Sequence, residues 1–339
     1  MSMKYIRDSS NTLSFNNYRQ LILAVLMILI PINSHADNSN SPAFFNYLTD
    51  CKKSPSLVAF NPSHFDPRKA IDVSDTALLD LKKDLQALAP AFNGLVLYET
   101  LPQLTHAILA EAKAQNYRAV LFGIWDPKND EEIKETAELI KAFHQQLALA
   151  VVIGNEGLLG NRYSLQDIQA AAEKLHLLLP KDTNIPLTTS EPIGEYGLPG
   201  LMQFGDFLTP NIHPAVDRDS VEPNEAAAWV KKRALAVAKI GKKPVLVKET
   251  GVPNGGKRAY TPNMQLLFWQ AYLKDGRIEQ VTGNTWVSFA AAFEAFDMSW
   301  KAEKSAIAIE GHWGLLDSKR QSYEAFKAWQ QAEQSCLSP

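Results

Sequence analysis

Two short stretches of the sequence place a glutamate at the end of an apolar run. Residues 151–154 (VVIG) are followed by Asn155 and Glu156, and the run 244–247 (PVLV) is followed by Lys248 and Glu249. Two carboxyl groups over one cleft suit the cleavage of a glycosidic bond, in which one protonates the leaving oxygen and the other attacks or stabilises the oxocarbenium-like carbon. The alternative is that both glutamates end their strands at the surface and form ordinary salt bridges.

Whether these glutamates meet depends on the elements around them. Apolar runs rich in Val, Leu, Ile and Phe recur along the chain, as is typical of strands buried on both faces of a parallel sheet. We predict eight strands, over residues 56–61, 94–99, 118–125, 147–154, 185–191, 206–213, 244–249 and 284–291. Between them we predict helices over residues 74–89, 164–179, 223–241, 261–276 and 321–334.

Three of these helices have recognisable first turns. Ser74 is an expected N-cap, and Ser164 with Asp167 three residues later is close to a capping box. Thr261 is a further expected cap, with Pro262 at the first helical position.

The alternation of eight strands with helices predicts an α/β fold, a (β/α)8 TIM barrel, over residues 43–339 as a single domain. An open doubly wound sheet is the alternative, but the turn after the first run has no glycine-rich phosphate loop. Catalytic groups of a barrel come from the C-terminal ends of its strands. Glu156 follows the fourth run and Glu249 ends the seventh, so we expect both at the same mouth.

Several stretches of the chain resemble glycoside hydrolase family 17, the β-1,3-glucanases and related glucan transglycosylases, in its bacterial form. GNE alone is a weak motif, but the stretches occur in family order and cover nearly the whole chain after its N-terminal region. They are LVAFNPSHFDP (57–67), LVLYET (95–100), FGIWDP (122–127), VIGNEGLL (152–159), TPNIHP (209–214), VKETGVP (247–253), FEAFDMSWK (293–301) and EGHWGLLD (310–317).

The resemblance implies a retaining enzyme that works through a glycosyl-enzyme intermediate. By position, Glu156 would be the acid/base, Glu249 the nucleophile, and Asn155 the partner of the sugar 2-OH, a contact that strengthens in the transition state. The further positions that match the family's cleft are Tyr98, Glu294 and Lys301.

The chain also departs from the family pattern at three positions. His213 stands where the family usually has a tyrosine that contacts the nucleophile, Val252 replaces a tryptophan, and Met298 replaces an acidic residue. His213 could still donate a hydrogen bond to Glu249, but it adds a group that titrates near neutral pH. These departures leave the expected catalytic pair intact, and they leave the fine specificity open.

Aromatic side chains are expected on the floor of a glucan cleft, because sugars stack their apolar C–H faces on rings. Trp125, Trp286, Trp300 and Trp313 fall at predicted strand ends or in the last loop of the barrel. We predict that Trp125, Trp286 and Trp313 bind substrate. Packing in the protein interior is the alternative for each.

The first 36 residues have the pattern of a secretory signal peptide. Basic residues precede the apolar run 21–30, and Ser-His-Ala at 34–36 is a small-residue cleavage site. The run is shorter than the roughly 20 residues of a membrane span. We predict export through the inner membrane to the periplasm or beyond, with no membrane attachment after cleavage; an uncleaved anchor is the alternative.

The net charge and the cysteine content limit which binding partners, disulfides and cofactors we expect. The net charge of −3 argues against nucleic-acid binding, which normally leaves a basic footprint. Cys51 and Cys336 could form a disulfide that ties the two ends of an exported chain together, or they could be free thiols. Neither CxxC nor HExxH occurs, and we expect neither a metal nor an organic cofactor.

We therefore expect an exported retaining glycoside hydrolase that acts on β-glucan, with β-1,3 linkages the first choice. If a second sugar replaces water as the acceptor, the same site would make the protein a β-glucan transglycosylase. A glucan-binding protein that has lost catalysis is the alternative from another class, motivated by the three departures from the family pattern.

Overall fold

A computed structural model describes residues 41–218 and 221–332, and the predicted signal peptide lies outside these ranges. Six parallel strands form one sheet in the order β5-β4-β3-β2-β1-β9. Their bounds are β1 Leu57–Ala59, β2 Gly94–Val96, β3 Ala119–Ile124, β4 Ala148–Asn155, β5 Leu187–Ser190 and β9 Ala291–Ala292.

A second sheet completes the ring, with β6 (Val245–Leu246), β8 (Thr285–Ser288) and β7 (Ile278–Thr282) in the order β6-β8-β7. The predicted eighth strand is split into β8 and β9, and it joins the two sheets because β8 pairs with β6 while β9 pairs with β1. The strand β7 is antiparallel to β8 and forms a hairpin with it.

The predicted sixth strand closes the other side of the ring. It is held by isolated bridges, in which Leu208 pairs with Val245, and Asn211 pairs with both Pro192 and Glu249. All eight predicted strands therefore take part in one closed (β/α)8 barrel, and the predicted fold is confirmed.

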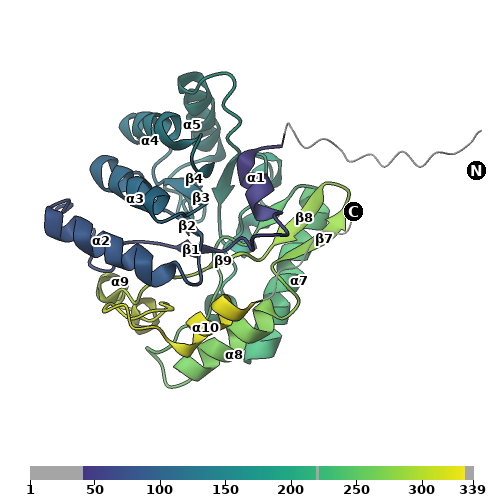
Figure 1. Ribbon diagram of the computed structural model, residues 1–339. Coiled ribbons are helices and arrows are strands. Elements are labelled where there is room, and N and C mark those ends of the chain that lie inside the picture. Colours follow the sequence, from purple (N-terminus) through teal and green to yellow (C-terminus); the bar gives the residue numbers. More distant parts are fainter. Residues whose placement is uncertain (1–40, 219–220, 333–339) are drawn as a thin grey trace, which may run out of the picture. The chain divides into compact units, whose positions relative to one another are not determined.

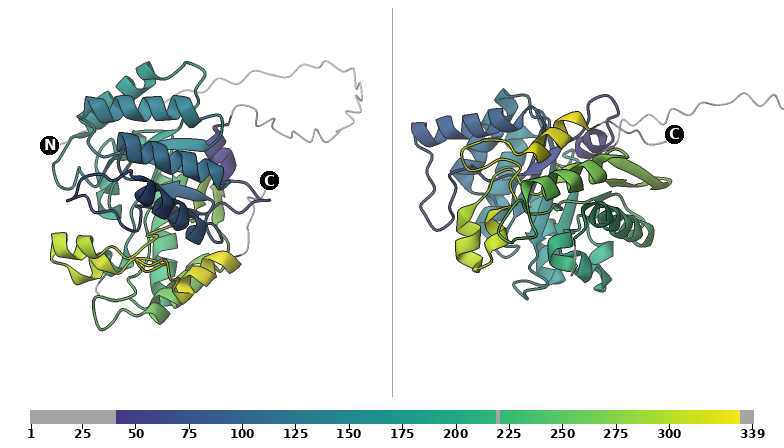
Figure 2. Two further views of the ribbon diagram at one scale, coloured as in Figure 1. Left: turned by 60° about the vertical axis from the view of Figure 1, so that its left-hand side comes forward. Right: turned by 90° about the horizontal axis from the view of Figure 1, so that it is seen from below.

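Helices lie on the outside of the strands, as Figures 1 and 2 show. The five predicted helices are present as α2 Asp75–Leu88, α5 Leu165–Leu178, α7 Pro223–Gly241, α8 Pro262–Leu273 and α10 Glu324–Gln331. The others are α1 Ala43–Leu48, α3 Pro102–Ala114, α4 Asp130–Phe143, α6 Pro214–Asp217 and α9 Ser299–Ser305, with short 3-10 turns at Ile193–Gly197, Leu201–Gln203 and Ala308–Gly311. Among the helices that the structure describes, none combines the length and the apolar character that a membrane span requires.

The predicted helix starts are confirmed by their hydrogen bonds. The Ser74 hydroxyl accepts from the third backbone N–H of α2, and Thr261 does the same for α8 at 3.2 Å. Ser164 and Asp167 form a reciprocal capping box at the start of α5. Each cap satisfies a backbone donor that would otherwise lack a partner.

The core has two layers, because side chains alternate between the two faces of each strand. In β3, Val120 and Phe122 pack toward the helices, whereas Ala119 and Leu121 point into the barrel. Small and medium-sized side chains fill the interior in this way, and α1 adds Phe44, Tyr47 and Leu48 to the same cluster. The interior is thus a packed core, and space for chemistry is left only at the strand ends.

Candidate active site

The end of β4 has an unusual backbone that brings Glu156 out of the strand. Gly154 has a φ of +79° and Glu156 a φ of +53°, and the register with β5 shifts between Val152 and Asn155. The left-handed region is uncommon for a residue with a side chain. A Cβ atom at Gly154 would lie 2.5 Å from the Tyr163 hydroxyl, so glycine is required there for space as well as for backbone angle.

Asn211, from the sixth strand, holds the carboxyl group of Glu156. Its Nδ2 donates to Glu156 Oε1 at 2.8 Å and to Asn155 Oδ1 at 3.3 Å. Its Oδ1 accepts from the hydroxyl of Ser190 at 2.9 Å, which fixes which way the amide faces. Asn211 therefore orients the carboxyl group of Glu156, and Ser190 in turn orients Asn211.

Glu249 lies among polar partners on the neighbouring strand end. Lys248 Nζ donates to Glu249 Oε1, and it also donates to Asn155 Oδ1 at 2.9 Å. His213 Nε2 lies 3.3 Å from Glu249 Oε2. Through Asn211, Asn155 and Lys248, hydrogen bonds connect the two glutamates at one end of the barrel, as the sequence predicts.

The two carboxyl groups have opposite pKa shifts. Burial raises the pKa of Glu156, and the charge of Glu249 raises it further, against a lowering by Asn211 and by the cations nearby. Burial also acts to raise the pKa of Glu249, but Lys248 and His213 outweigh it and lower that pKa to about 2. One carboxyl is held in its acid form to higher pH while the other stays ionised, which is the division that acid and nucleophile require.

Glu294 and Lys301 form a second charged pair near Glu249. Glu294 is 1% exposed, it accepts from Lys301 Nζ, and its Oε1 has no hydrogen-bond partner among the described residues. Burial raises its pKa to about 7, with the charges of Glu249 and Asp297 adding to the shift and Lys301 opposing it. Such a carboxyl group can accept or donate a hydrogen bond to a sugar near neutral pH.

Tyr98 comes from the end of β2 and faces the same carboxyl groups. Its hydroxyl is buried close to Glu249, and its ring lies 4.8 Å from Lys248 Nζ. Burial raises its pKa, and the charges of Glu249, Glu294 and Glu156 raise it further. The phenol stays protonated and is therefore a donor.

A wall of three rings lies beside Glu249. The ring centroids of His213 and Trp313 are 5.1 Å apart, and Phe293 packs 5.1 Å from His213 and 5.4 Å from Trp313, all edge to face. The indole N–H of Trp313 is buried, and no described residue accepts a hydrogen bond from it. Of the predicted residues, His213 thus lies next to Glu249, and Trp313 packs against His213.

Trp125 is an exposed aromatic residue at the C-terminal end of the barrel. It is 40% exposed, and the guanidinium of Arg162 lies 4.3 Å from the centre of its ring. Arg162 also donates to the backbone oxygen of Asn155. The cation stacked on Trp125 anchors a solvent-facing ring to the loop that follows Glu156.

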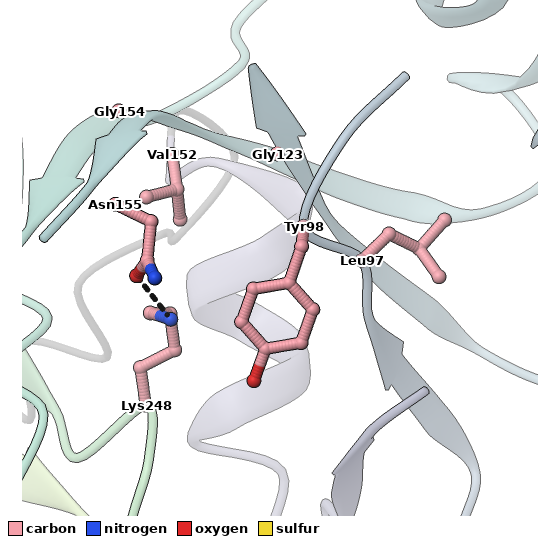
Figure 3. Close-up of a pocket in the computed structure, with 7 residues that line it drawn as sticks. All are labelled: Leu97, Tyr98, Gly123, Val152, Gly154, Asn155 and Lys248. Carbon is pink, nitrogen blue, oxygen red and sulfur yellow. Dashed lines mark hydrogen bonds between the residues drawn. The ribbon is translucent and has the colours of Figure 1, made fainter. Parts of the chain in front are cut away.

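A small cavity of about 10 Å³, enough for one water molecule, lies just inside the barrel below these groups. Figure 3 shows Tyr98, Asn155 and Lys248 converging on it. Its other lining residues are Leu97, Gly123, Val152 and Gly154.

Comparison with known proteins identifies the family. The BtgE/BtgC glycoside hydrolase domain matches residues 61–314. The chain belongs to this glycoside hydrolase family. A search of curated protein sequences found no significant match.

Solved structures with this barrel include enzymes of glycoside hydrolase family 17. A β-1,3-glucanosyltransferase of that family from Rhizomucor miehei has a TM-score of 0.61 and 16% identity, over 80% of this chain and 96% of its own. An endo-laminarinase from Formosa has a TM-score of 0.60 and 19% identity, over 78% and 83%. A β-1,3-glucanase of Cryptomeria japonica pollen has a TM-score of 0.58 and 14% identity, over 80% and 98%.

The position of Trp286 in this glycoside hydrolase corrects the sequence prediction for it. Trp286 is 6% exposed and packs against Phe45 of α1, in the cluster inside the barrel. Its neighbour Val287 pairs with Val245, at the start of β6, whereas Glu249 follows the end of that strand. Trp286 therefore lies at the N-terminal end of the barrel, away from the carboxyl pair.

The tryptophan in α9 and the two remaining departures from the family pattern are also placed. Trp300 lies edge-on to Phe65, with ring centroids 6.4 Å apart, and its buried indole N–H has no acceptor within residues 41–218 and 221–332. Val252 and Met298 are buried, at 0% and 2% exposure. They belong to the packing around the site.

Two residues of the glycoside hydrolase site were not assigned a role from the sequence. Asn211 and Lys248 are both buried polar side chains that form hydrogen bonds with Glu156, Glu249 or Asn155. Each sits in an apolar run, at a position where a buried strand would not carry a polar residue without a partner. That signal was present in the sequence, although it does not say which partner each residue finds.

Proposed function

We propose that this glycoside hydrolase acts on β-1,3-glucan with retention of configuration. Glu156 is the acid/base and Glu249 the nucleophile. The observation that carries the proposal is the opposite shift of two hydrogen-bond-connected carboxyl groups, with Glu249 at a pKa of about 2 and Glu156 above its ordinary range. The names of similar structures support the substrate, since one is a glucanosyltransferase complexed with laminaritriose.

In the first step, Glu249 attacks the anomeric carbon as Glu156 transfers its proton to the leaving oxygen. The glycosidic bond breaks and an ester to Glu249 forms. In the second step, Glu156, now ionised, takes a proton from the acceptor hydroxyl while that oxygen bonds to the anomeric carbon and the ester electron pair returns to Glu249.

Asn155 is suited to hold the 2-OH of the reacting sugar. Its Oδ1 already accepts from Lys248 and Asn211, and its Nδ2 has no protein partner among the described residues. The amide therefore presents a donor to the substrate.

The acceptor decides between two activities of this site. Water gives hydrolysis, and a second sugar gives glucan transfer, the activity named for the Rhizomucor miehei structure. Incubation of the purified protein with laminari-oligosaccharides of one length tests this. Products longer than the substrate indicate transfer, and only shorter products indicate hydrolysis.

The proposal is tested further by the stereochemistry of the product and by Glu249→Ala. Proton NMR of early products should show the β-anomer first, and Glu249→Ala should bind laminari-oligosaccharides without turnover. A first-formed α-anomer would overturn the retaining mechanism. Wild-type protein that binds β-glucans but turns over none of the β-1,3, β-1,6 or β-1,2 linkages would instead be a glucan-binding protein.

We also propose that the protein is exported and carries the Cys51–Cys336 disulfide. The signal pattern in residues 1–36 supports export, and Cys336 lies outside the described residues. Sequencing of the N-terminus from a periplasmic fraction and peptide mapping without reductant test the two points. A chain that begins at residue 1, or two alkylated cysteines, would refute them.

A further inference from the structure

Lys248 is a buried cation directly beneath the catalytic residues. Its side chain is 2% exposed, and its Nζ donates to Glu249 Oε1 and to Asn155 Oδ1. The ammonium also lies 4.8 Å from the centre of the Tyr98 ring. Figure 3 shows the lysine reaching up to the amide of Asn155, with Tyr98 beside it.

A buried ammonium is costly unless it is paired and hydrogen-bonded, so a lysine at this position needs a reason. A strand that faced only the apolar core would carry an apolar side chain here, as at Leu246 in the same run. Lys248 instead donates hydrogen bonds to Glu249, which the proposed reaction requires ionised, and to Asn155, which it requires in one orientation.

The groups around Glu249 show that its negative charge depends strongly on the Lys248 ammonium. The carboxyl groups of Glu156 and Glu294 lie near Glu249 and can carry only a negative charge or none, and the Tyr98 hydroxyl is uncharged. His213 is the other favourable partner, at 3.3 Å. Lys301 is engaged by Glu294 and does not contact Glu249 in any described hydrogen bond.

We propose that Lys248 is a positioning residue of the reaction, which keeps Glu249 as a free carboxylate and turns the Asn155 amide so that its Nδ2 faces the substrate. The inference rests on the proposed function and deepens it. One ammonium thereby couples the state of the nucleophile to the orientation of the sugar-binding amide.

The coupling has a consequence for the second step of catalysis. When Glu249 becomes an ester it loses its charge, and Lys248 loses its anionic partner. Lys248 therefore stabilises the free carboxylate relative to the ester, which favours return of the electron pair to Glu249 as the acceptor oxygen bonds to carbon. Removal of the ammonium should slow breakdown of the intermediate more than its formation.

The first test observes Glu249 directly and does not need enzyme activity. Protein labelled with ¹³C at the glutamate carboxyl carbons is titrated, and the Glu249 signal is assigned as the one missing from Glu249→Gln. In the wild type the carboxyl should stay ionised down to about pH 3. In Lys248→Met it should titrate at or above the ordinary value of 4.5.

Two more variants keep the test decisive if Lys248→Met does not fold. Lys248→Gln removes the charge but keeps a donor for Asn155, so the Glu249 signal should still titrate at higher pH. Lys248→Arg keeps a charge and should preserve the low titration. A Glu249 signal that titrates identically in every uncharged variant and the wild type would overturn the inference.

The second test measures kinetics on laminari-oligosaccharides across pH. Lys248→Met should lower kcat by about 10- to 100-fold, move the acid limb of kcat/KM to higher pH, and let a glycosyl-enzyme ester accumulate on Glu249. A purely structural lysine would change none of these pH limits. Wild-type protein with no activity on β-glucan would refute the proposed function and leave the carboxyl titration to decide the inference about Lys248.

Discussion

The two ends of this barrel are built from the same strands and have opposite character. At the N-terminal end, α1 contributes Phe44 to a sealed apolar cluster that also contains Phe207 and Trp286. At the C-terminal end, Glu249 is buried and Glu156 is half-buried, both among polar partners. The strands of one barrel can therefore carry apolar packing residues at their N-terminal ends and polar site residues at their C-terminal ends.

The difference shows why a barrel can hold buried charges. The apolar end is stabilised by removing apolar surface from water, a contribution of roughly 25 cal/mol per Å². The polar end opposes this with desolvated carboxyl and ammonium groups, which are tolerated because each finds a charged or hydrogen-bonding partner. Substitutions at the two ends should accordingly differ in what they damage.

The largest effect is expected at the polar end, from Glu249→Gln. Loss of the proposed nucleophile should lower kcat by about 10⁴-fold or more, because the proposed mechanism forms its ester on Glu249. Steady-state rates on laminari-oligosaccharides measure it. The exposed Glu225→Gln is the matched control and should keep wild-type rates. Activity of Glu249→Gln within tenfold of wild type would assign the nucleophile elsewhere.

At the apolar end, Phe44→Ala should reduce stability and leave chemistry intact. Truncation of a fully buried phenylalanine typically lowers the free energy of unfolding by about 3–5 kcal/mol. Urea unfolding measures the loss, and Leu198→Ala, at a 38% exposed position, should cost less than about 0.5 kcal/mol. A large drop in kcat/KM of the folded variant would show that the two ends are not separate.

Asn211→Ala tests the polar network with a smaller effect. Loss of its hydrogen bond to Glu156 should lower kcat by about 10- to 100-fold. Because Asn211 lowers the pKa of Glu156, its removal should raise that pKa further. Glu156 acts in its protonated form, so the alkaline limb of kcat/KM should move to higher pH. The exposed Asn224→Ala should leave the limb in place, and an unshifted limb in Asn211→Ala would contradict the assignment of Glu156.

Two tryptophans sharpen the comparison, since one lies at each end. Trp125→Ala should raise KM several-fold with little loss of stability, because its ring is solvent-facing beside the cleft loop. Trp286→Ala should leave KM unchanged and lower the free energy of unfolding by about 3–5 kcal/mol. A KM effect of Trp286→Ala in folded protein would restore its predicted role in substrate binding.

The smallest effect concerns the pH dependence of stability. The pKa of Glu294 is about 7 in the folded protein, above its ordinary value of 4.5. The stability that this group contributes is fully present below pH 4.5 and is lost as the pH rises through 7. Glu294→Gln should therefore show a flatter Tm between these values, by thermal unfolding. The exposed Glu303→Gln should follow the wild-type curve, and an unchanged slope in Glu294→Gln would contradict the raised pKa.

Much of the fold followed from local patterns in the sequence. The predicted strands and the caps at Ser74, Ser164 and Thr261 are all present, because strand burial and helix capping depend on residues close together in the chain. The two glutamates could be assigned to one mouth because parallel strands of a closed barrel end on the same side.

The position of a side chain along the barrel axis could not be predicted from local sequence patterns in the same way. Trp286 was predicted at the substrate-binding end although it stands near the start of its run, 284–291. The structure splits that run into β8 and β9 and places Trp286 at the N-terminal end of the barrel. Strand register in a closed sheet is set by pairing with distant segments. A local sequence pattern therefore does not determine this register.

The sequence by itself determined the alternation of strands and helices, and with it the side of the barrel on which Glu156 and Glu249 lie. The tertiary structure alone decided that Asn211 holds one carboxyl, that Lys248 holds the other, and that both meet at Asn155. The physical reason is that hydrogen bonds and pKa shifts depend on distances of a few ångströms between segments far apart in the chain.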